Sequence, residues 1–287
     1  PIALTHTNEA TMLIGWTADS KAVIVEEDHD RDERVTVYKI QLDAPLKMIP
    51  LTEDRPPFFL RTGAISPDGN SLYYACNFDF HEEEEIEQSY VYKHDLRTGG
   101  RVAIAKPEKA DWIVPQLNKA GTHLIYTRKD RHPGGRQIYL VDVDGNSDEE
   151  ILHFGDEHKV FARWLNDNKR LVFTSESVDG SPQDHISLGI YNVQTKGITW
   201  LVDDPARNIN AADVAEDGMI ILDEVDDANH KCTFIDPDTF KQTPAPQLAG
   251  NLLPLGKTAE GNWVGLYYAA NSPPDLVLFD ETTSSPE

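Results

Sequence analysis

Basic residues are scarce in this sequence: 26 Lys and Arg stand against 49 Asp and Glu among 287 residues, a formal net charge of −23. Binding to a nucleic-acid backbone needs a basic surface that displaces condensed counterions, and an anionic membrane surface repels an acidic chain. We therefore expect no nucleic acid and no membrane among the partners. With 39% hydrophobic residues, the chain is globular and not an acidic disordered one.

Long apolar runs and cysteines are also scarce. The longest apolar run, residues 263–270, has about half of the roughly 18 residues that a membrane helix needs. Cys76 and Cys232 are too few for a disulfide framework. The residues from Pro1 onward show no basic region followed by an apolar one, so we expect no signal peptide in this chain, which together with free cysteines favours the cytoplasm. A processed chain would begin in the same way, so the compartment stays open.

A short phrase, an apolar residue followed by a polar turn and a run of β-formers, recurs along the whole chain. Its clearest copy is Ile-Ser-Pro-Asp-Gly-Asn-Ser-Leu at 65–72. The successive turn residues are spaced by 49, 52, 47, 50 and 43 residues, which is the size of a propeller blade. These turn residues are Ser20, Gly69, Gly121, Asn168, Gly218 and Gly261.

The residues around each turn indicate a four-stranded antiparallel unit. Ser, Pro and Gly occupy the positions that a type I turn prefers at 66–69, so the turn joins a first and a second strand. Aromatic and β-branched residues then predict third strands at 35–38, 90–92, 137–140, 189–191 and 276–279. Fourth strands are expected at 47–52, 101–105, 150–154 and 199–202.

These units predict an all-β fold, a six-bladed β-propeller of four-stranded antiparallel blades, formed by residues 1–287 as a single domain. No stretch has sustained helical periodicity, and the alternative is a pair of unrelated β-sandwiches. The sixth unit lacks a fourth strand in sequence, whereas residues 1–5 resemble the fourth-strand ending at 47–52. We expect this N-terminal strand to close the last blade. Cys76 and Cys232 would lie in opposite blades, too far apart for a disulfide.

The Ser-Pro-Asp-Gly phrase at 66–69 and the following Leu72-Tyr73-Tyr74 resemble the repeat of TolB-like, WD40-like propellers. The same repeat builds the propeller domain of prolyl oligopeptidase-family (S9) serine peptidases. The segment Asn271–Leu276 is similar to the last blade of that family, which favours the peptidase over a free-standing TolB-like propeller. Family propellers usually have seven or eight blades, and this chain has six units.

The peptidase resemblance implies an α/β-hydrolase domain that this chain lacks. A hydrolase nucleophile requires Gly-x-Ser-x-Gly, and only Gly69 and Gly145 have Ser two residues later. Tyr73 and Glu149 occupy the final position of the two copies, so we expect no catalytic residue here. The family propeller covers the active site and admits only small or unfolded peptides. The chain alone would then filter and steer peptide substrates for a serine peptidase.

An acidic run follows the second strand of blade two and contains Glu82, Glu83, Glu84 and Glu85. We interpret it as a polar loop on one rim, either simply solvated or drawing a cationic group such as a peptide N-terminus toward the pore. Dipeptidyl peptidases use a propeller Glu pair in this way. The equivalent loops of blades one and three, 28–34 and 130–136, should lie on the same rim, where the basic loop 130–136 could pair with the acidic run.

No cofactor and no metal are expected, although two places offer oxygen ligands. Residues 142–148 have Asp or Asn at alternate positions, as calcium loops do, but lack the bidentate Glu of an EF-hand. Asn210 and Asp213 would serve a third hypothesis, a propeller hydrolase with a metal at the pore, as in lactonases. The second hypothesis remains a TolB-like propeller that binds a partner protein or peptide.

Overall fold

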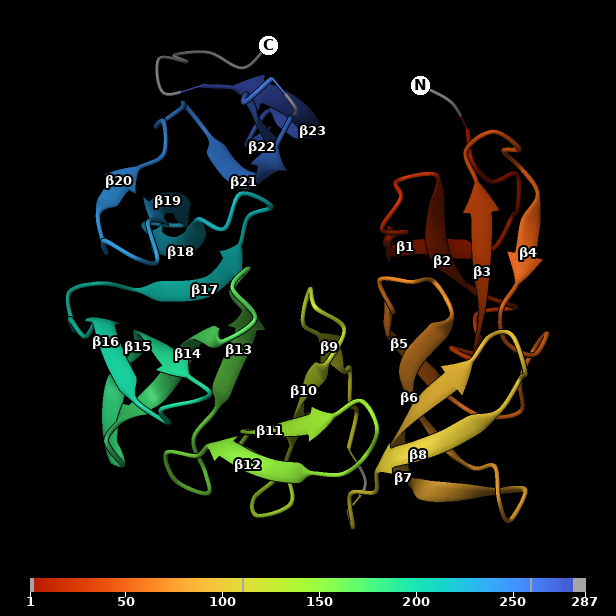
Figure 1. Cartoon of the computed structure of the whole chain (residues 1–287). Coiled ribbons are helices and arrows are strands. Elements are labelled where there is room, and N and C mark those ends of the chain that lie inside the picture. Colours follow the sequence, from red (N-terminus) through yellow and green to blue (C-terminus); the bar gives the residue numbers. More distant parts are fainter. Residues whose placement is uncertain (1–2, 110, 259, 281–287) are drawn as a thin grey trace. The chain divides into compact units, whose positions relative to one another are not determined.

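The computed structural model describes residues 3–109, 111–258 and 260–280. All regular elements in these residues are β-strands, and none is a helix. The chain forms two compact units, residues 1–152 and 153–287, and each contains three antiparallel sheets (Figure 1).

The first unit contains three four-stranded sheets, and each sheet follows the chain from strand to neighbouring strand. The first sheet consists of β1 (Ala10–Trp16), β2 (Ala22–Asp28), β3 (Val35–Gln41) and β4 (Met48–Pro50). The second consists of β5 (Leu60–Ile65), β6 (Ser71–Asp79), β7 (Glu84–Asp95) and β8 (Arg101–Ala105). The third consists of β9 (Gln116–Leu117), β10 (His123–Arg128), β11 (Gln137–Asp142) and β12 (Asp148–Leu152).

The second unit repeats this plan with one difference, because its last sheet has three strands. The fourth sheet consists of β13 (Val160–Trp164), β14 (Arg170–Val178), β15 (Ser181–Asn192) and β16 (Ile198–Val202). The fifth consists of β17 (Ile209–Val214), β18 (Ile220–Asp226), β19 (Asn229–Ile235) and β20 (Gln242–Pro244). The sixth consists of β21 (Asn251–Lys257), β22 (Trp263–Ala269) and β23 (Ser272–Phe279).

The six repeated turn residues all adopt the left-handed backbone conformation. Their φ values run from 55° at Ser20 to 91° at Gly218. In each turn the amide of this residue donates to the carbonyl three positions earlier, as Gly69 does to Ser66 at 2.8 Å. Gly and Asn adopt this conformation more readily than other residues, which explains why they occupy five of the six positions. The blade-sized repeat is thus a repeat of one backbone turn.

Aspartates end several third strands, as the sequence indicates. The Oδ1 atom of Asp95 accepts hydrogen bonds from the amides of Arg97 and Thr98, both at 2.9 Å. These backbone donors lower the pKa of Asp95, the amide of Thr98 most of all. Asp236 holds the amide of Thr239 in the same way. The carboxylate therefore closes the turn that leads into the fourth strand.

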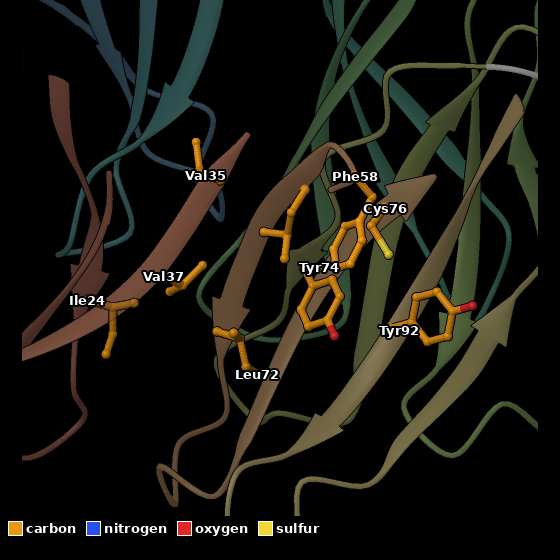
Figure 2. Packing of buried hydrophobic residues seen from close by; sticks show 9 residues of the cluster. Ile24, Val35, Val37, Phe58, Leu72, Tyr74, Cys76 and Tyr92 are labelled. Atoms are coloured by element: carbon orange, nitrogen blue, oxygen red, sulfur yellow. The ribbon is translucent and has the colours of Figure 1, made fainter. Parts of the chain in front are cut away.

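Neighbouring sheets within each unit pack through apolar faces. Between the first and second sheets, Val37 lies in one cluster with Leu72 and Tyr74, and all three are fully buried (Figure 2). In the second unit, Val172 of the fourth sheet packs in the same manner with Leu222 of the fifth. Strands buried on both faces need apolar residues at successive positions, which the run 22–25 supplies.

The six sheets confirm the all-β six-bladed propeller class. Cys76 and Cys232 are free, as expected, and both are buried. One prediction, the closure of the last blade by residues 1–5, needs correction. Within the part of the chain that the structure describes, residues 3–5 form no strand and the sixth sheet has three strands. The carbonyl of Leu4 instead accepts a hydrogen bond from the amide of Leu46, and the Leu4 side chain packs on the first sheet. Pro1 and Ile2 lie outside the described residues. That residues 1–287 act as one domain stays a prediction.

Trp16 is the last residue of β1 and, despite its size, lies outside the core. It is 55% exposed, because it lies at the end of β1 opposite Val23, whereas smaller branched residues such as Ile24 fill the core. Trp164 is half-buried. Among the described residues, no helix has the length and apolar character needed to cross a membrane.

Candidate functional site

The acidic run lies at the tip of the β6–β7 hairpin. It was expected to be a loop, but Glu84 and Glu85 belong to β7, where they pair with Asp79 and Phe78. Only residues 80–83 form the turn. The Oδ1 atom of Asp79 holds it by accepting hydrogen bonds from the amides of His81 and Glu82. The amide of His81 is the main cause of the lowered pKa of Asp79.

The four carboxylates are all exposed but have different surroundings. Glu82 lies 3.6 Å from the ring of His81, and Glu85 accepts a hydrogen bond from Asn77 Nδ2 at 2.9 Å. Asn77 in turn accepts one from the amide of Phe59, so Glu85 is tied to the segment before β5. Glu83 has a φ of 57° and lines a pocket at the base of the hairpin. The structure thus places the run on one hairpin without giving its members a common partner.

The pocket beside Glu83 has a volume of about 590 Å³ and aromatic walls. Phe58 stacks on Phe78 with 4.8 Å between ring centroids, and Phe80 meets both rings edge-on at 5.4 and 5.1 Å. Sequence reasoning missed these phenylalanines, which occur as Phe58-Phe59 before β5 and as Phe78-Asp79-Phe80 just before the acidic run. The clustering of phenylalanines in the sequence is the signal that could have indicated this pocket. Strand periodicity alone would place these side chains in the hydrophobic core.

Arg101 forms the charged wall of the same pocket. Its guanidinium lies 4.3 Å from the centroid of Phe80 and pairs with Glu53 at 2.6 Å. Its Nε donates to the hydroxyl of Tyr74 at 2.7 Å, and burial raises the pKa of that phenol. Lys106 adds a second cation close by, 3.8 Å from Asp79. The surroundings of the tip are therefore mixed in charge, which weakens its attraction for cations compared with the sequence expectation.

The other two rim loops are held by pairs of their own. In loop 28–34, Asp30 pairs with Arg55 at 2.8 Å. In loop 130–136, Arg131 donates to both carboxylate oxygens of Glu150 in the third sheet. The partner seen for Arg131 is thus a carboxylate of its own sheet.

The oxygen-rich segment 142–148 forms a hairpin turn. Asp142 Oδ1 accepts from the amide of Asp144 at 2.7 Å, while the carboxylate of Asp144 pairs with Lys93. Asp148 accepts a hydrogen bond from the hydroxyl of Tyr126 at 2.7 Å. The three carboxylates thus have separate partners.

Asn210 and Asp213 lie on β17, a first strand as expected, but have separate partners too. Asn210 donates to Asp223 at 2.7 Å, and Asp213 lies 3.7 Å from Arg163. Across the described residues, no group of three or more His, Cys, Asp or Glu could hold a metal ion. Of the two serines with a partial nucleophile motif, Ser71 starts β6 and Ser147 lies in the turn before β12.

No protein-family model and no curated protein sequence matches this chain. Several solved protein structures, in contrast, match this chain. A prolyl endopeptidase, studied for the role of inter-domain dynamics in catalysis and specificity, has a TM-score of 0.71 at 12% identity, over 97% of this chain and 42% of its own. TolB from Acinetobacter baumannii has a TM-score of 0.53 at 16% identity, over 96% of this chain and 64% of its own.

Oligogalacturonate lyase from Vibrio parahaemolyticus has a TM-score of 0.70 at 16% identity, over 99% of this chain and 80% of its own. Identities this low show the fold alone. The resemblance to TolB and to prolyl oligopeptidase propellers is confirmed at that level, and this chain spans less than half of the peptidase.

Proposed function

We propose that this chain is the propeller domain of a prolyl oligopeptidase-family serine peptidase, where it controls the access of peptides to a hydrolase domain. The observation that carries the proposal is the match to the prolyl endopeptidase, which takes 97% of this chain but 42% of the peptidase. The proposal assigns the matched share of the peptidase to its propeller and the catalytic residues to the part that this chain does not match.

The described residues fit a non-catalytic role. Ser71 and Ser147, which carry the partial nucleophile motifs, are held in strand and turn positions, not in a strand-to-helix elbow. The two thiols lie buried, and burial raises the pKa of Cys76 and of Cys232 to about 12. A buried neutral thiol is a poor nucleophile. Selection of peptides by size and charge is then the role that this domain would supply.

The coding sequence beyond Glu287 tests the proposal directly. We expect roughly 250 further residues, at the upper end of the usual range of domain lengths, that contain Gly-x-Ser-x-Gly. The assembled protein should cleave short peptides and spare folded proteins, and removal of the propeller should abolish this discrimination. A reading frame without a hydrolase domain would contradict the proposal and favour the alternative, a free-standing TolB-like propeller that binds a protein or peptide partner.

Steering by Glu82, Glu83, Glu84 and Glu85 is a separate part of the proposal. Replacing all four with glutamine should slow the association of basic peptides at low salt, because exposed charges act mainly on encounter rates. The control replaces Glu157 and Asp184 of the second unit, which are also exposed. Stopped-flow association rates that are equal in both variants would rule out steering by this hairpin.

A further inference from the structure

A second pocket, of about 470 Å³, lies within the first unit and is unrelated to the acidic run. Strands β1, β2, β3 and β5 supply its walls together with loop 29–34 and the segment between β8 and β9. It combines three kinds of side chain: apolar Met12 and Val35, aromatic Trp112, and charged groups. The charged groups are Glu26, Asp28, Glu33 and Arg61.

Trp112 is held in place yet stays half exposed. Its amide donates to Asp111 at 2.6 Å, and the carboxylate of Asp111, itself buried, pairs with Lys129 at 3.3 Å. The indole ring lies 3.3 Å from the guanidinium carbon of Arg61 and 6.1 Å from the ring of Phe59. Even so, Trp112 is 51% exposed. Trp112 thus lines the pocket with part of its ring free, and aromatic side chains in such positions are common anchors of ligands.

The apolar wall is exposed as well. Met12 on β1 is 63% exposed, and its Cα partner in β2 is Glu26. The pocket therefore places a flexible thioether beside a carboxylate, which suits an alkyl chain that carries a charge at its end.

The charges in the pocket leave an excess of carboxylates. Arg61 is largely buried, donates to the carbonyl oxygens of Glu33 and Leu60, and lies 3.8 Å from the Glu33 carboxylate. Its one positive charge faces three carboxylates, Glu26 most strongly, then Glu33 and Asp28, and also lies against the ring of Trp112. Three carboxylates against one guanidinium leave the pocket with a negative excess, although Asp28 Oδ1 also accepts a hydrogen bond from the amide of Glu33 at 3.1 Å. Burial raises the pKa of Glu26.

A ligand for this pocket must combine a cation with an apolar stem. An anion would meet the excess of carboxylates, and a purely apolar ligand would desolvate Glu26 and Asp28 without pairing them. Indole is the best aromatic partner for a cation. We infer that this pocket binds the side chain of an arginine or lysine residue within a peptide. The inference rests on the proposed function, which it deepens by naming the side chain that the peptide carries.

The test uses the full chain and calorimetric titration with two blocked tripeptides, acetyl-Gly-Arg-Gly-amide and acetyl-Gly-citrulline-Gly-amide, which share shape but differ in charge. We expect the arginine peptide to bind at least about tenfold more tightly, since a hydrogen-bonded ion pair outweighs a neutral contact by that much. Equal affinities would overturn the inference. Free arginine that binds as tightly as the peptide would overturn the assignment to a peptide.

Variants locate the binding. Glu26→Gln should weaken the arginine peptide about tenfold, and Trp112→Leu, which removes no charge, should weaken both peptides. Asp43→Asn is the matched control, because Asp43 is an exposed carboxylate of the same unit that lies outside the pocket. A loss in Glu26→Gln no larger than in Asp43→Asn would overturn the inference. All these titrations use the chain alone, so their results do not depend on whether a hydrolase domain follows Glu287.

Discussion

Replacing His94 with glutamine tests whether the second sheet keeps an imidazole buried and neutral. His94 lies on β7, is 4% exposed, and meets the ring of Tyr74 edge-on at 6.0 Å. Its Nδ1 atom has no hydrogen-bond partner among the described residues. Burial, aided by the charge of Arg101, lowers the pKa of His94 to about 4.

The sign of the effect follows from this depressed pKa. The unfolded chain takes up a proton near the ordinary value of about 6.5, whereas the folded chain resists protonation until about pH 4. Above pH 6.5, His94 is neutral in both states and does not affect the free energy of unfolding. As the pH falls from 6.5 toward 4, only the unfolded chain gains the proton, so the free energy of unfolding decreases. At about 1.36 kcal/mol per pKa unit, the full loss is about 3 kcal/mol, and about 2 kcal/mol of it has occurred by pH 5.

The assay is urea denaturation of the unmodified chain and of His94→Gln at pH 8 and at pH 5. Carboxylates titrate in both proteins, so the quantity of interest is the difference between the two pH dependences. We expect the unmodified chain to lose about 2 kcal/mol more than the variant between these pH values. His81→Gln is the control, because its side chain is 89% exposed on the same hairpin. Parallel losses in the unmodified chain and His94→Gln would refute the reasoning.

Three further predictions concern turns and thiols. In urea denaturation, Gly121→Ala should destabilise the fold more than Gly69→Ala. Both glycines have a φ near 70°, and placing alanine in that conformation costs about 1 kcal/mol at either position. Only at Gly121 does the added Cβ also meet another atom, Pro67 Cδ at 2.6 Å. Similar losses would show that the turn relaxes. Ala228→Gly should stabilise by about 1 kcal/mol, because Ala228 has a φ of 63° in a two-residue hairpin turn, and Gly180→Ala in the equivalent turn should cost a similar amount. An unchanged urea midpoint would contradict this. Cys76 and Cys232 should stay unlabelled by a thiol reagent at pH 8 and both react in guanidinium, because burial raises each thiol pKa to about 12; labelling of the folded chain would contradict their burial.

The sequence predicted those parts of the fold that depend on neighbouring residues. Each repeated turn requires one residue in the left-handed backbone conformation. Gly and Asn favour that conformation, so residues such as Gly69 and Asn168 mark the turn in the sequence. The third and fourth strands follow from the same local rules, which is why 101–105 coincides with β8. The acidic hairpin was placed in the right sheet, but its extent was not, since cross-strand pairing carries β7 back to Glu84.

The remaining features depend on packing between distant segments. Trp112 and Arg61 lie 51 positions apart in the sequence, and only the approach of the segment before β9 to β5 stacks them. No periodicity marks such a pair. The prediction for residues 1–5 was wrong for a related reason. The sequence around Leu4 resembles a fourth strand, but the Leu4 side chain packs against apolar residues of the first sheet. Local sequence patterns indicate which residues can form a strand, but they do not determine which sheet that strand pairs with or packs against.

The hairpins between second and third strands differ in length from one unit to the other, and this difference bears on the order of folding. In the second unit, β14 and β15 are joined by two residues, as are β18 and β19, whereas residues 129–136 separate β10 from β11 in the first. Short connections lose less chain entropy on closing, and two left-handed residues match the twist of the strands that they join. We therefore expect amide protection during refolding to emerge first at the β14–β15 and β18–β19 hairpins. The sheets that carry the long loops and both pockets should acquire it later.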